Sequence, residues 1–174
     1  MQNTWHGLNQ GVAFAAGKAM LGLQNAGTNV ERVARCWLLN NQTAAVTGVI
    51  CFMEVRLYPA TFSWTTPTTV TPVAHDSNNS ALSSVTFGNS GTPGGSTPAV
   101  LRRVLWSSDE PSASTATSDE LECFVPLNVV WDSGYGDTDV QKLALRQNQA
   151  FLVWNTTGAA GIVDSELEWT DAAS

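Results

Sequence analysis

The feature that most constrains the fold of this chain is a period-two alternation of apolar and polar residues. From Val49 to Leu57, and again from Leu121 to Trp131, every odd position is apolar. A third segment, Val163–Trp169, also alternates. Because successive side chains of a strand point to opposite faces, the pattern predicts strands with one buried face, formed by these apolar residues. The residues of the third segment that we expect to face solvent are Asp164, Glu166 and Glu168.

Two shorter apolar runs, Val100–Trp106 and Ala150–Trp154, predict further strands. Pro126 cannot donate a ladder hydrogen bond, which predicts an edge strand or a bulge in its segment. The segment 30–39 is ambiguous, because its apolar residues recur at helical spacing and a capping box precedes them. Helix and strand both stay open for this segment, and the surrounding pattern favours a strand.

Three segments have the composition of long loops, rich in Gly, Pro, Ser or Thr: Asn89–Pro98, Asp109–Asp119 and Thr65–Asn79. The last of them could include a short strand around Val70–Val73. About seven to nine strands with such loops between them predict a mostly β fold, an antiparallel β-sandwich. A jelly roll is the version that best limits exposed sheet edges. We expect residues 30–174 to form the sandwich and residues 1–29 to be an N-terminal arm or a first strand.

Composition and charge narrow the classes of function. The 174 residues include 15 Asp and Glu against 8 Lys and Arg, a net charge of −7. This balance argues against sequence-independent nucleic-acid binding, which needs Lys and Arg to neutralise phosphates. No stretch reaches the roughly 18 consecutive apolar residues of a membrane helix, and no basic segment of a signal peptide is seen. Three widely spaced cysteines, Cys36, Cys51 and Cys123, predict reduced core thiols in a chain made in a cytoplasm.

The strongest local signal for a metal is the segment 132–139, in which Asp132, Asp137 and Asp139 accompany two glycines. Calcium binds several oxygens of a flexible turn, so these carboxylates are a weak calcium candidate. Their spacing departs from the EF-hand pattern, and a turn stabilised by Asp and Gly explains the segment as well. We expect no metal and no cofactor.

The sequence motifs give no support to catalysis. His75-Asp76 has no Gly-x-Ser-x-Gly segment to supply a nucleophile, and phosphate-binding and dinucleotide motifs are absent from the sequence. Glu166 and Glu168 are spaced as solvated charges on one strand face. We therefore expect that the chain is not an enzyme.

The seven tryptophans and the pair Arg102-Arg103 favour a protein interface, where Trp and Arg are enriched. Several tryptophans fit core or half-core positions on the expected strands. Sparse surface charge together with abundant Trp predicts a homo-oligomer. The residues that we expect at an interface are Trp5, Phe14, Trp64, Arg102, Arg103 and Trp106.

Several stretches resemble small virion structural proteins of tailed bacteriophages. They are Leu39–Val49, Leu101–Pro111, Val125–Asn128, Asp132–Gly136 and Leu145–Gln147. The resemblance is to capsid decoration (cement) proteins, and it implies a jelly-roll sandwich, commonly a homotrimer, that binds the major capsid protein on the surface of the virion after assembly in the host cytoplasm. It implies no catalytic residues. The N-terminal region matches least well, and a capsid-binding arm is one interpretation of it.

Two other classes of function stay open at this stage. A head domain of a tail spike or fibre would share the fold but bind a host-surface carbohydrate receptor, through a sugar-sized groove with aromatic side chains. A lectin-like protein or a hydrolase would need a pocket with perturbed carboxylates. The sequence leaves open which virion component is contacted and which face of the protein binds it.

Overall fold

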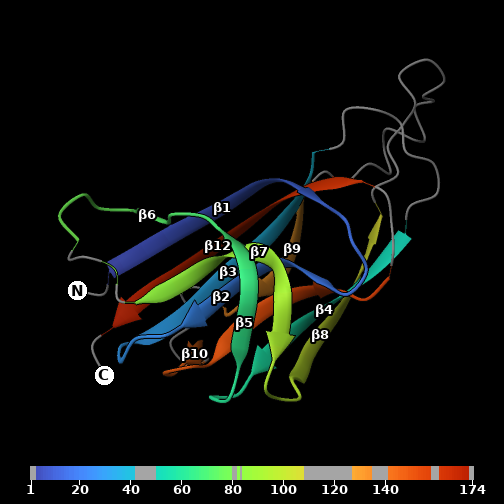
Figure 1. The fold of residues 1–174 in the computed structure, drawn as a ribbon. Helices are drawn as coiled ribbons and strands as arrows, with labels where there is room; N and C mark the ends of the chain where they lie inside the picture. The colour runs from blue at the N-terminus through green and yellow to red at the C-terminus, as the bar shows by residue number, and fades with distance from the viewer. Residues whose placement is uncertain are drawn as a thin grey trace.

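The computed structural model describes residues 3–41, 50–79, 82, 84–107, 127–134, 141–157 and 161–172. Every regular element within these residues is a β-strand (Figure 1). The described part of the chain has no helix long and apolar enough to cross a membrane. In chain order the strands are β1 (Asn3–Ala13), β2 (Lys18–Asn25), β3 (Val30–Asn40), β4 (Ile50–Tyr58), β5 (Ser63–Thr69), β6 (Val73–Ala74), β7 (Val85–Gly94), β8 (Ala99–Ser107), β9 (Leu127–Asp132), β10 (Leu143–Leu145), β11 (Ala150–Asn155) and β12 (Ile162–Ala172).

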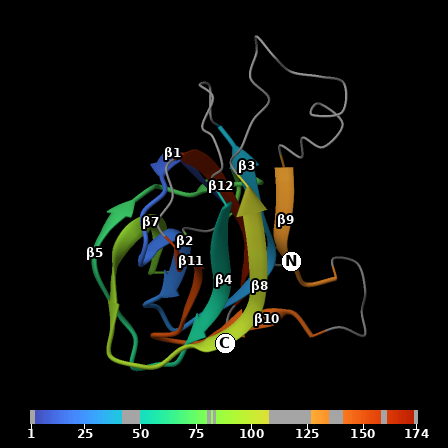
Figure 2. The same cartoon turned by 90° about the vertical axis from the view of Figure 1, so that its right-hand side faces the viewer.

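The strands form two antiparallel sheets, which confirms the expected two-sheet arrangement. Sheet A has the order β10-β3-β12-β1-β6, and β9 also pairs with β3. Sheet B has the order β5-β7-β2-β11-β4-β8. The pairing is nested along the chain, since β1 pairs with β12, β2 with β11, β3 with β9 and β10, and β4 with β8. The last pair, β4 and β8, lies side by side in both views of the fold (Figure 1, Figure 2).

The main core lies between the two sheets. Trp169 of sheet A stacks on Phe87 of sheet B, with 5.7 Å between ring centroids. The Phe87 ring fills the space beside Gly7 that a Cβ would need, so this position of β1 has room only for glycine. Large side chains that are fully buried in this core include Met20, Leu21, Leu23, Leu38, Met53, Leu145, Phe151, Leu167 and Trp169.

A second, smaller cluster covers part of the outer face of sheet B. Ala150 and Leu152 alternate along β11 with residues of the main core, and they pack with Tyr58, Phe62 and Trp64. The indole N–H of Trp64 donates to a backbone carbonyl of β7 at 3.2 Å. One part of the outer face of sheet B is therefore closed by the chain itself.

Residues 3–25, which the sequence left open between an arm and a first strand, form β1 and β2. β1 lies between β12 and β6 in sheet A, and β2 lies between β11 and β7 in sheet B. The sandwich thus includes residues on both sides of the expected boundary at residue 30. The ambiguous segment 30–39 belongs to strand β3, because its backbone pairs with β12 on one side and with β9 and β10 on the other.

The loop expected over Asn89–Pro98 is wrong for its first half, because β7 continues to Gly94 and pairs there with β5. Ser90 and Gly91 have φ values of 58° and 62°. They coincide with a shift in the register between β7 and β2. The turn-forming composition therefore supplies a bulge inside a strand. Part of the expected loop Thr65–Asn79 is likewise strand β5, and the short strand expected around Val70–Val73 is found at Val73–Ala74 as β6.

The face expected for Val129 is also wrong. Trp131 pairs with Cys36 and Val129 pairs with Trp37, so Val130 is an extra residue in β9. This bulge turns Val130 into the core and leaves Val129 45% exposed. The segments 109–119 and 121–126, expected as a loop and as the start of this strand, lie outside the described residues.

Asp164 is buried, in contrast to the solvent-facing position expected for it. The Gly11 N–H and the Asn41 side-chain amide donate to its Oδ1 at 2.7 Å and 2.9 Å. These two hydrogen bonds replace water around the carboxylate, which allows this charged residue to occupy a buried position in β12.

Cys36 is a buried free thiol, as expected. Burial, and to a smaller extent the nearby charge of Glu166, raise the pKa of this thiol well above its ordinary value. The side chains of Cys51 and Cys123 lie outside the described residues.

Candidate interaction surface

The six residues expected at an interface fall in different environments. Trp5 and Phe14 are only 8% and 7% exposed and pack in the main core, so they present little surface to a partner. Trp64 is partly buried against the outer cluster of sheet B. The side chain of Trp106 lies outside the described residues. The remaining two, Arg102 and Arg103, are exposed and adjacent on β8.

The proposed calcium segment is described only at its start. Asp132 accepts a hydrogen bond from the Gly134 N–H at 2.9 Å and forms an ion pair with Arg35 at 3.2 Å. This is the turn geometry that Asp and Gly typically produce. Asp137 and Asp139 lie outside the described residues, and no group of three metal-ligating side chains occurs among the residues that are described.

Strand β8 forms one border of sheet B and pairs with β4 alone among the described strands. On the side of β4 away from β8, the Phe52 N–H donates to the Thr157 hydroxyl at 3.0 Å, and the Phe52 carbonyl accepts the Thr156 N–H at 2.9 Å. Leu105 lies opposite Phe52 in the ladder. Because antiparallel pairs alternate between hydrogen-bonded and non-hydrogen-bonded, the Leu105 N–H and carbonyl point away from β4. They point to the side of β8 on which no strand of the described residues pairs, which we call its open side.

The two borders of sheet B differ in chemistry. The other border, β5, consists mostly of Thr, contains Pro67 and has a positive φ of 50° at Thr66. Proline and a local distortion are devices that prevent a sheet edge from pairing with another strand. β8 runs for nine residues without proline. Its one irregularity is a bulge at Leu101, so the stretch from Arg102 to Ser107 keeps a regular register with β4.

Exposed apolar side chains gather on and beside β8. Phe52 and Leu105 face each other across the ladder and are 53% and 60% exposed. Val100 and Leu101 on β8 are also exposed. These four are more than half of the exposed large hydrophobic residues found in the described part of the chain, and the facing pair Phe52 and Leu105 forms an apolar patch.

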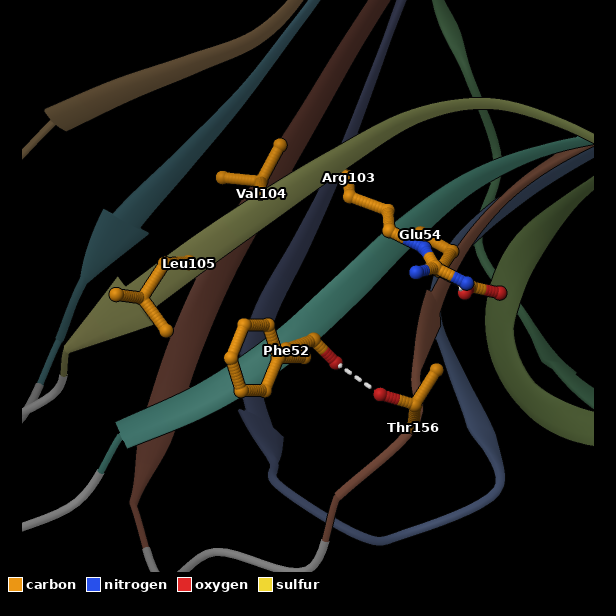
Figure 3. Close-up of a pocket in the computed structure, with 6 residues that line it drawn as sticks. All are labelled: Phe52, Glu54, Arg103, Val104, Leu105 and Thr156. Carbon is orange, nitrogen blue, oxygen red and sulfur yellow. Dashed lines mark hydrogen bonds and ion pairs between the residues drawn. The ribbon is translucent and has the colours of Figure 1, made fainter.

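A shallow groove of about 580 Å³ accompanies the patch. Figure 3 shows Phe52 and Leu105 beside one another on β4 and β8, with the hydrogen bond between Phe52 and Thr156 at one side. The residues lining the groove are Phe52, Glu54, Arg103, Val104, Leu105 and Thr156. We call the edge of β8 that points away from β4, together with this groove, the β8 surface.

The β8 surface is locally basic. Glu54 has a side chain only 10% exposed, and it accepts hydrogen bonds from Arg56 at 2.7 Å and from Arg103 at 3.1 Å. Arg102 reaches across to sheet A, where it donates to the Val130 carbonyl at 3.4 Å. The strands β4 and β8 together carry three arginines and one glutamate, a local charge of +2.

This local charge contrasts with the chain as a whole. In the described residues eight Lys and Arg are balanced by eight Asp and Glu, and the other seven acidic residues lie between positions 109 and 122 or at positions 137 and 139. The Arg103 side chain is 75% exposed despite its ion pair, so it remains accessible to a second carboxylate. The arrangement is suited to holding an acidic and partly apolar protein segment.

Sequence reasoning identified Arg102 and Arg103 but missed Phe52 and the groove. One signal was available: Phe52 is an apolar residue at an even position of Val49–Leu57, on the same face as Glu54. The position of β8 at a border depends on pairing between distant strands, which periodicity along the chain does not reveal.

Comparisons with protein-family models, with curated proteins and with solved structures gave no match to this chain.

Proposed function

We propose that this chain is a virion structural protein that decorates and stabilises a bacteriophage capsid by binding the lattice of the major capsid protein. The single observation that carries the proposal is the β8 surface, a regular sheet border with exposed apolar residues and two exposed arginines. Such a border is a template for contact with another protein chain. The stretches that resemble decoration proteins include Leu101–Pro111, which begins on β8.

The nested pairing supports a jelly roll as the arrangement of the sandwich. In a jelly roll an antiparallel chain is folded so that its first and last strands pair, and the successive pairs alternate between two sheets. The pairs β1 with β12 and β3 with β9 and β10 belong to sheet A, whereas β2 with β11 and β4 with β8 belong to sheet B. On this interpretation β5, β6 and β7 are an insertion between β4 and β8. Viral capsid domains are one group of proteins that use this arrangement.

A rigid sandwich is physically suited to this role. A module that bridges neighbouring capsid subunits gains avidity from several weak contacts made at the same time. A homotrimer would match the three-fold and quasi-three-fold positions of a capsid lattice. The chain mass of 18.5 kDa then predicts a particle of about 55 kDa in light scattering.

The experiment that tests this function mixes the purified protein with undecorated capsids of the phage that encodes it and images the particles. Regular density at three-fold or quasi-three-fold positions is the expected result. Absence of binding at saturating protein concentration would contradict the proposal.

A second candidate function is receptor binding as a head domain of a tail spike or fibre. One observation favours it, because the groove places the aromatic Phe52 beside the polar side chains Glu54 and Arg103, a combination that suits a sugar ring. Adhesion of the labelled protein to host cells, lost on addition of host-surface carbohydrate and combined with no capsid binding, would favour this candidate over decoration.

A further inference from the structure

The open side of β8 has the features of a strand-addition site with a defined sequence preference. Its backbone N–H and carbonyl groups at Leu105 point away from β4, and the register between Arg102 and Ser107 is regular. An extended partner segment placed there would continue the ladder of sheet B. The side chains of β8 then decide which segment is accepted.

We infer that β8 binds an extended segment of a partner protein as an added antiparallel strand, and that this segment reads apolar, apolar, acidic, acidic from its N-terminus to its C-terminus. The inference rests on the proposed function in one respect, that the chain works by binding another protein. It goes further by naming the strand that binds and the chemistry of the segment that is bound.

The order of residue types follows from the register. Leu105 and Arg103 lie on the outer face of sheet B, because they pair with Phe52 and Glu54. Val104 and Arg102 lie on the inner side, because they pair with two buried residues of β4. An antiparallel segment therefore meets Leu105 first, then Val104, then Arg103 and finally Arg102. Cross-strand partners of like polarity and opposite charge are the favourable ones, which gives two apolar residues followed by two acidic residues.

Charge complementarity selects this occupant over a second copy of β8. A symmetric pair of β8 strands would bring the four arginines of the two β8 strands together, and with the adjacent β4 strands the total is six arginines against two glutamates. Like charges in adjacent strands are destabilising, whereas carboxylates of a partner segment form charge-assisted hydrogen bonds with Arg102 and Arg103.

The test uses three end-blocked, fluorescently labelled peptides on the full chain. The first contains two valines followed by two glutamates between flanking threonines, the second has lysine for glutamate, and the third has the glutamates before the valines. Fluorescence anisotropy at low salt measures each dissociation constant. We expect the first peptide to bind at least tenfold more tightly than the other two, and to weaken as salt is raised.

Two variants, each with a control variant, separate backbone pairing from charge. Leu105→Pro removes an N–H that points to the open side of β8, at the kind of position where edge strands tolerate proline, and should weaken binding of the first peptide at least tenfold. Leu105→Thr, which keeps the N–H and is expected to fold in any case, should weaken it by a smaller factor. The double variant Arg102→Glu with Arg103→Glu should bind the lysine peptide in preference. Arg146→Glu, at an exposed arginine in the turn before β11, outside β4 and β8, should leave the preference unchanged.

Equal affinity for the glutamate and lysine peptides, or no measurable binding of the glutamate peptide at millimolar concentration, would overturn the inference. Unaltered binding of the glutamate peptide by a Leu105→Pro variant that keeps a native circular dichroism spectrum would also overturn the inference. A mass near 37 kDa for the wild type that falls to 18.5 kDa in Leu105→Pro would show a second copy on β8 and also overturn it. Capsid binding without peptide binding refutes only this inference, and peptide binding without capsid binding refutes only the proposed function.

Discussion

Two leucines on sheet B allow binding to be separated from stability. Leu105 at the border strand is 60% exposed, and Leu152 on β11 is fully buried under the outer cluster that contains Trp64. Replacing each with alanine removes the same atoms from the same sheet. Leu105→Ala should therefore mainly weaken partner binding, whereas Leu152→Ala should mainly lower stability.

The magnitudes follow from burial. Full burial of a leucine side chain stabilises a protein by about 1.5–3 kcal/mol. Because less than half of the Leu105 surface is buried, truncating it should lower the free energy of unfolding by under about 1 kcal/mol. Leu152→Ala also leaves a cavity in a packed cluster and should cost about 2–5 kcal/mol. At about 2–4 °C per kcal/mol for a chain of this size, Leu152→Ala lowers the Tm by roughly 4–20 °C and Leu105→Ala by less than about 4 °C.

The assay combines thermal unfolding, followed by circular dichroism, with sedimentation of the protein together with undecorated capsids. Leu105→Ala should lower the Tm by less than about 4 °C and weaken capsid binding severalfold. Leu152→Ala should lose stability and keep its binding at temperatures where it is folded. The reasoning is refuted if Leu105→Ala binds like the wild type, or if it unfolds as early as Leu152→Ala.

Three further predictions concern stability. Glu54→Gln leaves both arginine partners without their carboxylate in a mostly buried position, and should cost about 1–3 kcal/mol in urea unfolding; an unchanged midpoint would contradict the importance of this cluster. Gly88→Ala places a Cβ against the Thr68 backbone and should lower the free energy of unfolding in urea by about 1–3 kcal/mol or more. An unaltered midpoint would show that β5 can shift to make room for the Cβ. The raised pKa of the Cys36 thiol predicts that stability falls as pH rises above about 8.5, because the unfolded thiol loses its proton and the folded one keeps it. The wild type should lose up to about 1.4 kcal/mol per pH unit relative to Cys36→Ala, and parallel pH profiles of the two proteins would contradict the burial of this thiol.

The fold class could be predicted from the sequence because burial in a strand leaves a direct mark on it. The alternation from Val49 to Leu57 corresponds to β4, and the apolar run Ala150–Trp154 corresponds to β11, which is apolar on both faces because both are covered. The helical spacing after residue 30 was overridden, since a backbone that pairs on both edges is fixed as a strand whatever its local preference.

Errors arose where one residue changed the phase of a strand. The extra residue Val130 moved Val129 out of the core while Trp131 kept its expected contact with the core, and no feature of the side chains at this point indicates the bulge. Ser90 and Gly91 have turn-forming character but lie inside β7, because a bulge and a turn both use positive φ. Local composition does not distinguish the two.

The candidate site was only half visible in the sequence. Two adjacent arginines indicate an interface residue type, and both proved to be exposed on one strand. The strand's position at a border, the groove beside it and the role of Glu54 all depend on the pairing of β8 with β4, which are separated by three other strands along the chain. That information is carried by the whole fold.

The central claim is that this protein binds its partner through the open side of β8. Hydrogen–deuterium exchange with mass spectrometry, on the protein free and bound to undecorated capsids, tests it most directly. We predict that residues 99–107 exchange more slowly in the bound state while the other border strand, 63–69, is unchanged. Bound protein whose residues 99–107 exchange as rapidly as in the free state would contradict the account.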